Sequence, residues 1–113
     1  LCLDCKHLQL VNIINPKILF SNYLYSSGVS NVYLKHLKDY SKDLIRKYKL
    51  NQYKDSICDI GSNDGSFLKF FNRIGYKVLG IEPSCNLAKI ANNAGIKTIN
   101  DFLGKKFVNS NNN

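Results

Sequence analysis

The sequence predicts an α/β protein, the first half of a Rossmann-like doubly wound sheet with about three parallel strands, preceded by helices. The first observation is a short apolar run with β-branched residues, 56–60, which leads through a turn of Gly, Ser, Asn and Asp, 61–65, into apolar residues at helical spacing. The second is another apolar run, 77–81, that ends on the acid Glu82. This order of strand, loop, helix and acid-ended strand is typical of nucleotide-binding sheets.

The segment before the sheet predicts two helices. Apolar positions in 16–25 suit a short helix that starts at Pro16, and 26–30 is expected to be a loop. Ser30 is a good N-cap for a longer helix from Asn31 to about Leu50, in which an apolar stripe alternates with lysines.

Glycines define the elements that follow. Gly75 and Gly95 each stand where a left-handed residue ends a helix, so helices are expected between Phe67 and Gly75 and between Ser84 and Gly95. The run 96–99 predicts the third strand, and residues 101–107 the start of another helix.

The glycine pattern of the loop indicates which nucleoside cofactor would bind there. A dinucleotide loop has the pattern G-x-G-x-x-G, which directs backbone amides at a pyrophosphate. This chain has Asp59-x-Gly61-x-x-x-Gly65 instead. An anionic Asp59 would repel a pyrophosphate but pair with an ammonium, and S-adenosylmethionine carries an ammonium and a ribose without phosphate. Asn63 stands where the strict loop has a glycine, and asparagine tolerates left-handed backbone.

Candidate cofactor-binding residues lie in this loop. Asp59 would organise contacts to the methionine amino group, while Gly61 and Gly65 let the backbone pass close to the ligand. Two alternatives stay open for the polar residues between the glycines, which either face the ligand or only build the turn. These residues are Ser62, Asn63 and Asp64.

Further candidates follow the second and third strands. Glu82 would bind the ribose hydroxyls, because an acid that ends an apolar strand needs a partner; the alternative is a solvent-exposed strand end. Pro83 and Ser84 would border the adenine. Asp101 and Phe102 would meet the adenine amino group and ring, although Phe102 also suits the core.

These segments resemble a known family. The run from Asp59 to Leu68, the segment from Gly80 to Ser84, and residues 88–91 and 95–98 are similar to class I methyltransferases that C-methylate nucleotide-activated deoxysugars. Upstream, Cys2-x-x-Cys5, Leu19-Phe20 and the segment from Tyr23 to Gly28 resemble the end of that family's zinc-binding module and its link to the catalytic domain. The resemblance covers almost the whole chain and implies a methyltransferase that uses S-adenosylmethionine on a nucleotide sugar.

The resemblance also implies residue roles. Tyr23, Tyr25 and Ser27 would reach over the site next to the substrate, or the tyrosines would simply pack the linking segment against the sheet. Cys2 and Cys5 would supply two of the four ligands of a zinc ion, with His7 as a possible third; the alternative is two free thiols at a frayed terminus. The base that prepares the sugar carbon is not assigned, so the catalytic residues are unknown.

The chain is expected to be a fragment, since a complete domain of this fold has more strands, the sequence contains no Met, and its end is rich in Asn. We divide it into a zinc-module remnant (1–15), a helical linker (16–55), a partial S-adenosylmethionine-binding domain (56–108) and a disordered tail (109–113). The first strand would then have an open edge for the missing remainder or for another protein. The fragment alone is expected to be inactive.

Charge and composition limit the classes of partner that the chain is expected to bind. The net charge of +8 comes from 16 basic and 8 acidic residues, mostly Lys, which a solvated helix face explains without a nucleic-acid partner. A basic surface would attract the two phosphates of a nucleotide sugar. No membrane span or signal peptide is evident, and Cys58 and Cys85 are expected to be buried or cap-adjacent thiols, so a cytoplasmic protein is predicted.

Two other functions stay open. A fragment of an NAD-dependent sugar-modifying enzyme would bind a dinucleotide, but it needs a glycine where Asn63 stands. A non-catalytic remnant or adaptor with a Rossmann-like half-domain would bind another chain through its open edge. Salt-sensitive binding to nucleic acid would support a charge-driven adaptor.

Overall fold

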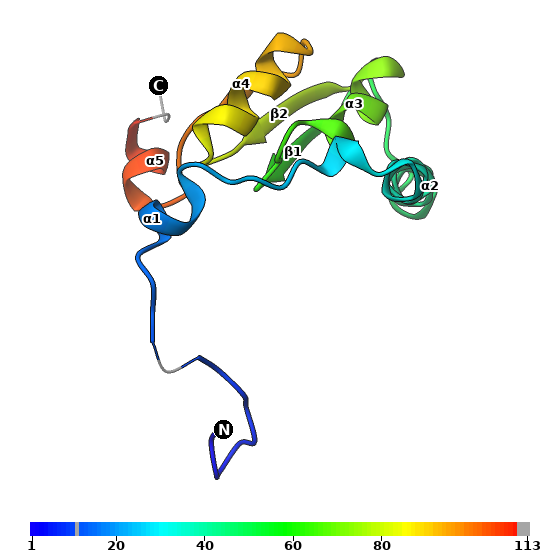
Figure 1. Ribbon diagram of the computed structural model, residues 1–113. Coiled ribbons are helices and arrows are strands. Elements are labelled where there is room, and N and C mark those ends of the chain that lie inside the picture. Colours follow the sequence, from blue (N-terminus) through cyan, green and yellow to red (C-terminus); the bar gives the residue numbers. More distant parts are fainter. Residues whose placement is uncertain (11, 111–113) are drawn as a thin grey trace.

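The computed structural model describes residues 1–10 and 12–110. After two short N-terminal helical turns and one long helix, strands and helices alternate (Figure 1). The elements are α1 (Pro16–Phe20), the 3₁₀ helix η1 (Ser27–Val29), α2 (Asn31–Tyr48), β1 (Ser56–Ile60), α3 (Ser66–Arg73), β2 (Lys77–Ile81), α4 (Cys85–Asn93), β3 (Thr98–Ile99) and α5 (Lys105–Ser110).

The three strands form one parallel sheet in the order β1-β2-β3, which confirms the predicted fold class. Asp59 of β1 is paired with Gly80 of β2, and Ile81 at the end of β2 is paired with Ile99. Because parallel strands point the same way, the loops that follow β1, β2 and β3 all leave from the same end of the sheet, where the carboxyl ends of the strands lie. Ligands of such sheets bind at the carboxyl ends of the strands.

Helices α3 and α4 cover one face of the sheet. Leu68 of α3, Ala91 of α4 and Ile96 are almost completely buried together, and Ile57 and Val78 pack against them from the sheet. The other face of β1 is uncovered, and the burial of this strand alternates accordingly. The open edge expected for β1 is also present, since among the described strands β1 pairs only with β2.

The prediction of a buried Cys58 is therefore wrong. Successive side chains of a strand point to opposite faces. Cys58 points to the face that none of the described helices covers, as does Ile60, whose exposed fraction is 61%. Cys85 is exposed as well, and it lies at the start of α4 next to the N-cap residue Ser84.

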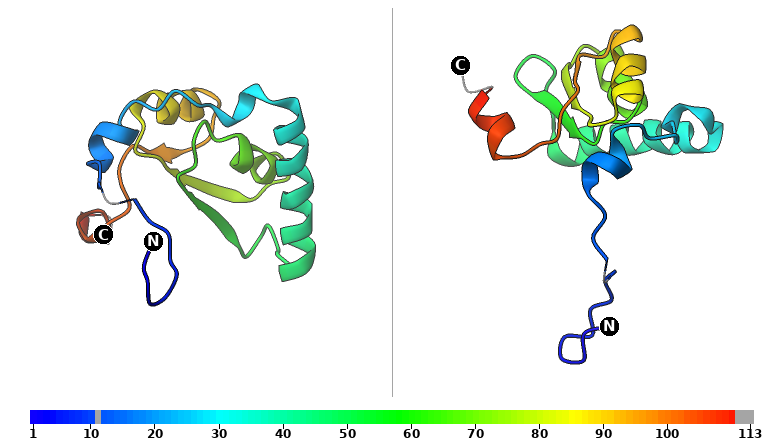
Figure 2. Two further views of the ribbon diagram at one scale, coloured as in Figure 1. Left: turned by 60° about the horizontal axis from the view of Figure 1, so that its bottom comes forward. Right: turned by 60° about the vertical axis from the view of Figure 1, so that its left-hand side comes forward.

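Helix α2 packs beside α3 (Figures 1 and 2). Ser30 caps it as predicted, since its hydroxyl accepts a hydrogen bond from the Tyr33 amide at 3.3 Å. The helix ends before Lys49, which has a left-handed backbone with φ of 51°. Stacked rings of Tyr40 and Phe67, 5.8 Å apart, join the two helices.

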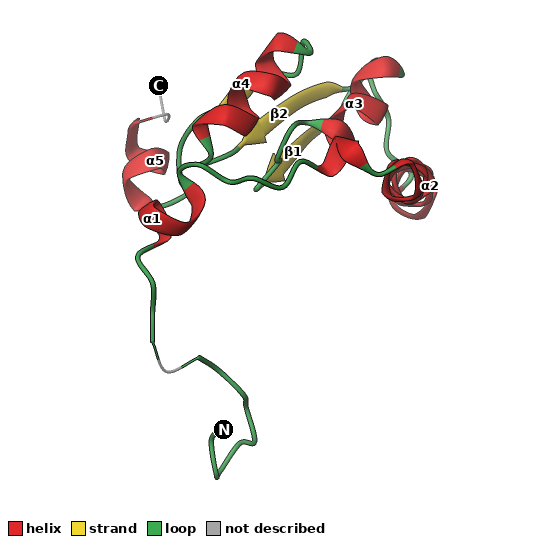
Figure 3. Cartoon of the chain, viewed as in Figure 1, coloured by secondary structure: helices red, strands yellow, loops and turns green. Residues whose placement is uncertain are grey.

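The N-terminal helix is shorter than predicted. It ends at Phe20 rather than Tyr25, because hydrogen bonds to the start of α4 hold the following residues in an extended course. The Cys85 amide donates to the Ser21 carbonyl at 3.1 Å, and the Tyr23 amide donates to the Ser84 hydroxyl at 2.9 Å. Figure 3 shows this stretch as a loop between α1 and α2.

The C-terminal elements also differ from the prediction. The third strand contains only Thr98 and Ile99, and α5 begins at Lys105 and continues to Ser110. Residues 109–110, assigned to the tail in the sequence analysis, belong to α5, a helix whose Phe107 is buried. Residues 111–113 lie outside the described part of the chain.

Residues 1–10 and 12–14 are exposed and lead away from the sheet and its helices (Figure 1). Within the described residues, no helix combines the length and the apolar character that crossing a membrane requires.

Candidate cofactor-binding site

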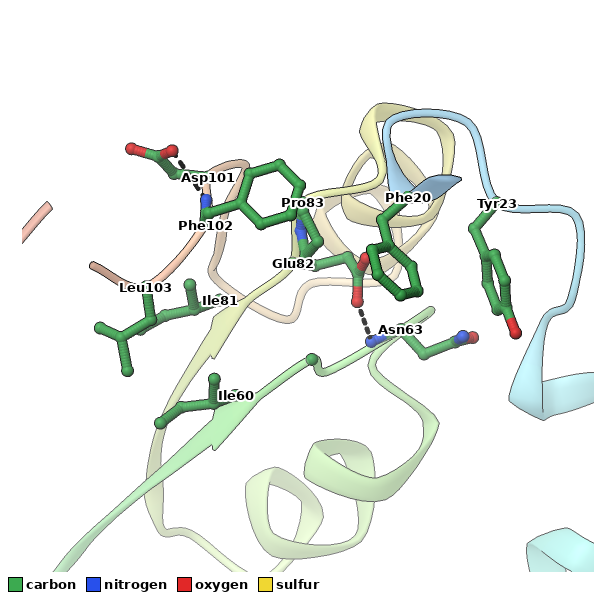
Figure 4. Close-up of a pocket in the computed structure, with 11 residues that line it drawn as sticks. Phe20, Tyr23, Ile60, Asn63, Ile81, Glu82, Pro83, Asp101, Phe102 and Leu103 are labelled. Atoms are coloured by element: carbon green, nitrogen blue, oxygen red, sulfur yellow. Dashed lines mark hydrogen bonds between the residues drawn. The ribbon is translucent and has the colours of Figure 1, made fainter. Parts of the chain in front are cut away.

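A cavity of about 410 Å³ opens where β1 and β2 end (Figure 4). Its size is within the range of small-molecule sites, which are mostly apolar with a few polar groups. The wall is of this kind. It is formed by Phe20, Tyr23, Ile60, Gly61, Asn63, Ile81, Glu82, Pro83, Asp101, Phe102 and Leu103.

The loop after β1 turns through three left-handed residues. Gly61 and Gly65 have φ of 76°, and Asn63 has φ of 53°, in agreement with the expected tolerance of asparagine. The two glycines differ in their surroundings. A Cβ on Gly61 would meet nothing within 4 Å, whereas one on Gly65 would lie 3.1 Å from Ala91 and 3.2 Å from Ile96. Gly61 thus faces open space at the cavity, while Gly65 lets the loop pack on the core.

Every backbone N–H of this loop already has an acceptor within the protein. The Gly61 and Ser62 amides donate to the Ile81 carbonyl at 2.8 and 3.2 Å. The Asn63 amide donates to Glu82 Oε2 at 2.7 Å. The Asp64 amide binds the Asn63 side chain at 2.9 Å, and the Gly65 amide binds the Ser62 carbonyl at 3.0 Å. The loop therefore offers no free amide to a ligand.

Glu82 is buried at the edge of the cavity, with 6% of its surface exposed. Its two carboxylate oxygens accept different amides, Oε2 that of Asn63 and Oε1 that of Ser84 at 2.9 Å. The alternative of a solvent-exposed strand end is therefore excluded. Each oxygen retains a lone pair that could accept a hydroxyl of a ligand.

Asp59 lies near Glu82 but does not line the cavity. Burial, together with repulsion from the Glu82 carboxylate, raises the pKa of Asp59 above its usual value. Within the described part of the chain its carboxylate has no hydrogen-bond or ion-pair partner. Asp59 and Glu82 therefore make the end of the sheet electronegative.

The linker segment, residues 21–30, is tied to the loop. The Ser26 hydroxyl and the Gly28 amide both donate to Asp64 Oδ2, the latter at 2.7 Å. Asn63 accepts the Ser27 amide at 2.9 Å through Oδ1 and donates to the Tyr25 carbonyl at 3.0 Å through Nδ2. Asp64 and Asn63 thus use their side chains to hold the linker segment.

The other half of the linker segment is tied to the start of α4. The Tyr23 amide donates to Ser84 Oγ at 2.9 Å, and Asn86 Nδ2 donates to the Tyr23 carbonyl at 2.9 Å. These contacts hold the rings of Phe20 and Tyr23 at the cavity, with centroids 5.9 Å apart (Figure 4).

The predicted site residues therefore separate into two groups. Those that line the cavity are Tyr23, Gly61, Asn63, Glu82, Pro83, Asp101 and Phe102. Those that lie beside it are Tyr25, Ser27, Asp59, Ser62, Asp64, Gly65 and Ser84, which is completely buried and does not border the cavity as predicted. Ser62 is turned away: its buried hydroxyl lies under Gly80 and has no hydrogen-bond partner within residues 1–10 and 12–110.

Four apolar residues of the wall were not predicted: Phe20, Ile60, Ile81 and Leu103. A sequence signal existed for Ile60 and Ile81, which are the last residues of the two strands. For Phe20 no local signal existed, because the course of the linker segment places it there.

The N-terminal cysteines form a local turn of their own. Amides of Cys5 and then Asp4, with a further hydrogen bond to the Cys5 side chain, lower the pKa of the Cys2 thiol. Lys6, the next residue, has a left-handed backbone with φ of 61°. Within residues 1–10 and 12–110, no three His, Cys, Asp or Glu side chains gather as metal ligands, so His7 does not join the two cysteines.

Comparison with known proteins adds three findings. A family model described as a methyltransferase domain matches residues 33–112. C-methyltransferase NovU of Streptomyces niveus is 31% identical over 98 residues, which make up 87% of this chain and 23% of NovU. The chain thus spans about a quarter of the length of that relative. Among solved structures, the plantazolicin methyltransferase BpumL in complex with SAH is similar with a TM-score of 0.46 and 23% identity, over 58% of this chain and 26% of that chain.

Proposed function

The chain belongs to the methyltransferase domain family, and from this premise we propose that it forms the S-adenosylmethionine-binding part of an enzyme that C-methylates a nucleotide-activated deoxysugar. The cavity at the ends of β1 and β2 would hold the cofactor, which supplies an electrophilic methyl group when bound.

The occupied amides of the loop are the observation that carries the choice of cofactor. Dinucleotide loops bind a pyrophosphate with free N–H groups at a helix N-terminus. Here the five amides of residues 61–65 are engaged, and the Ser66 amide, the first of α3, donates to Asp64 Oδ1 at 3.1 Å. The carboxylates of Asp59 and Glu82, at the same end of the sheet, would also repel a phosphate. This arrangement favours a cofactor without phosphate over NAD.

The two carboxylates suit the two polar ends of the proposed cofactor. Asp59 is partly buried, has a raised pKa and has no partner among the described residues, so an ammonium group close by would stabilise its charged form. Glu82 is already fixed by two amides, and its free lone pairs would accept the hydroxyls of a ribose. Asn63, Gly61 and Pro83 would complete the wall around the nucleoside.

Aromatic residues provide a place for the adenine. Phe102 approaches from the segment after β3, Phe20 from the end of α1 and Tyr23 from the linker segment. An adenine bordered by Pro83 and Phe102, with its amino group toward Asp101, would be shielded from water on both faces. Tyr23, Tyr25 and Ser27 would then lie on the side from which a substrate reaches the methyl group.

The substrate assignment depends on the sequence resemblance and on NovU, a C-methyltransferase. Methylation of a sugar carbon requires a base that removes a proton beside a ketone and an enolate in line with the methyl group. We assign only the donor side of this reaction to the chain. The net charge of +8 would favour a substrate that carries a diphosphate.

The zinc proposal concerns Cys2 and Cys5. Their spacing fits a metal-binding pair, and the lowered pKa of the Cys2 thiol favours the thiolate that zinc requires. Two further ligands would have to come from other segments of a longer protein.

All four cysteines of the chain are free thiols, which suits the proposed cytoplasmic location.

The test is calorimetric titration of the 113-residue chain with S-adenosylhomocysteine and with NAD. Glu82→Gln leaves one amide without its acceptor, and Asp59→Asn removes the charge that would pair with the ammonium. Asp39→Asn is the matched control, because Asp39 is an exposed residue of α2 whose one ion pair among the described residues is with Lys42. We expect each site variant to weaken S-adenosylhomocysteine binding by about tenfold or more and the control to leave it unchanged.

The same titration decides between the alternatives. Tighter binding of NAD would favour the dinucleotide enzyme. A chain that is folded by circular dichroism but binds neither ligand would favour the adaptor, which would use the open edge of β1.

A further inference from the structure

A second cavity, of about 460 Å³, lies between α2 and α3 and is lined by basic side chains from both helices. Lys35 and Lys38 come from α2, and Lys69 and Arg73 come from α3. The cavity shares no lining residue with the one at Glu82. It therefore requires its own explanation.

Helical spacing brings the four cations to one place. Lys35 and Lys38 are three residues apart, and Lys69 and Arg73 are four apart, so each pair lies on one face of its helix. The two helices pack side by side, joined by the stacked rings of Tyr40 and Phe67. Two basic faces thus converge on the same space.

None of the four cations has an ion-pair partner within the described residues, where the ion pairs are Lys42–Asp39 and Arg46–Asp43. The cavity has no acidic lining residue either. Asp64 lies behind it, but its carboxylate is occupied by Ser26, Gly28 and Ser66. Four positive charges that converge without a counterion repel one another, and a bound anion would remove that repulsion.

We propose that this cavity binds a small organic molecule that carries a diphosphate. Arg and Lys are the residues that bind phosphate most strongly in proteins, and four of them match an anion with several negative charges. Leu34 and Phe70 add apolar lining for the organic group attached to it. The volume suits a ligand of nucleotide size. The proposal goes beyond the cofactor site and does not depend on it.

The test is titration of the 113-residue chain with sodium pyrophosphate, inorganic phosphate and uridine diphosphate. The double variant Lys69→Gln, Arg73→Gln removes the α3 cations, both of which are exposed and belong to no salt bridge in the described residues. The matched control is Lys89→Gln, Lys97→Gln, which removes the same charge from exposed positions outside both cavities. Circular dichroism checks that each variant is folded.

We expect saturable binding in which pyrophosphate and uridine diphosphate bind more tightly than phosphate. The α3 variant should weaken pyrophosphate binding by about tenfold or more, and the control by less than about twofold. S-adenosylhomocysteine affinity should be the same in both variants. Equal weakening in the two variants, or the absence of saturable binding, would overturn the proposal. If a DNA duplex bound more tightly than pyrophosphate, and both variants weakened that binding equally, the result would instead indicate a diffuse nucleic-acid surface.

Discussion

The Gly28 amide donates a hydrogen bond of 2.7 Å to the Asp64 carboxylate, across 36 positions of the sequence. Asp64 stands in the loop proposed to bind a cofactor, yet its side chain holds the linker segment. This contact joins the linker segment, which carries Tyr23, to the loop that carries Gly61 and Asn63. The walls of the cavity are therefore coupled through a residue that does not line it.

Substitution of Gly28 should disturb this coupling. A Cβ at residue 28 would lie 2.8 Å from Asp64 Oδ2 and 3.1 Å from Ser66 Oγ, so Gly28→Ala would push the linker segment off the loop. We expect a loss of about 1–2 kcal/mol in stability and several-fold weaker S-adenosylhomocysteine binding, measured by urea unfolding and calorimetry. Ser26→Ala, which removes one hydrogen bond without a clash, should have a smaller effect. Unchanged affinity in Gly28→Ala would show that the linker segment is not part of the site.

The stability of the fold should depend on pH through Asp64. Burial alone would raise its pKa, but hydrogen bonds from Ser26, Ser66 and Gly28 outweigh burial and lower the pKa of Asp64 below its usual value. The carboxylate therefore stabilises the fold above about pH 4, and this contribution disappears as the pH falls below that value. Urea unfolding at stepped pH should show the stability difference between the wild type and Asp64→Asn shrinking below about pH 4. A constant difference would contradict the assignment.

Asp59 should behave in the opposite way. Its raised pKa means that folding disfavours its charged form, so Asp59 lowers stability as the pH rises through its folded pKa. At pH 7 we expect Asp59→Asn to unfold at a higher temperature than the wild type and to bind S-adenosylhomocysteine more weakly. Thermal unfolding and calorimetry on the same samples test both effects. A variant that loses stability and affinity together would indicate a structural role for the carboxylate instead.

Gly80 should be intolerant of any side chain. A Cβ there would lie 2.5 Å from Ser62 Oγ and 2.7 Å from Thr98 Oγ1, in the middle of the sheet below the loop. We expect Gly80→Ala to destabilise the chain by about 1–3 kcal/mol, the usual effect of overpacking. Gly104→Ala is the control, because a Cβ at residue 104 would meet no atom within 4 Å. Equal unfolding midpoints for the two variants would contradict this packing.

The isolated chain is predicted to bind the cofactor product without catalysing methyl transfer. We assign no base and no sugar-binding residue to the described part of the cavity wall. Incubation with radiolabelled S-adenosylmethionine and a nucleotide keto-sugar should therefore transfer no label to the sugar. Turnover that survives repeated purification and is lost in Glu82→Gln would disprove this prediction.

Local patterns predicted most of the secondary structure. Both main strands have the predicted bounds, and Ser30, Gly75 and Gly95 stand at helix ends as expected, because capping and left-handed backbone depend on neighbouring residues. The N-terminal helix was predicted too long and α5 was missed in part. Contacts with distant residues explain both differences. Hydrogen bonds to Ser84 and Asn86 hold the linker segment extended, and α5 buries Phe107.

The sequence by itself determined that a strand, a glycine loop and an acid-ended strand would meet at one end of a parallel sheet. Alternation and glycine conformation are local properties, and a helix between two strands makes them parallel. Only the tertiary structure decided how each polar side chain is used. Glu82 is buried at the cavity, and Asp59 beside it has no partner in the part of the chain that the structure describes. Ser62 turns under Gly80, and Asp64 turns to Gly28. The physical reason is that a hydrogen bond needs a partner at the right distance, and here the partners come from segments far apart in the chain.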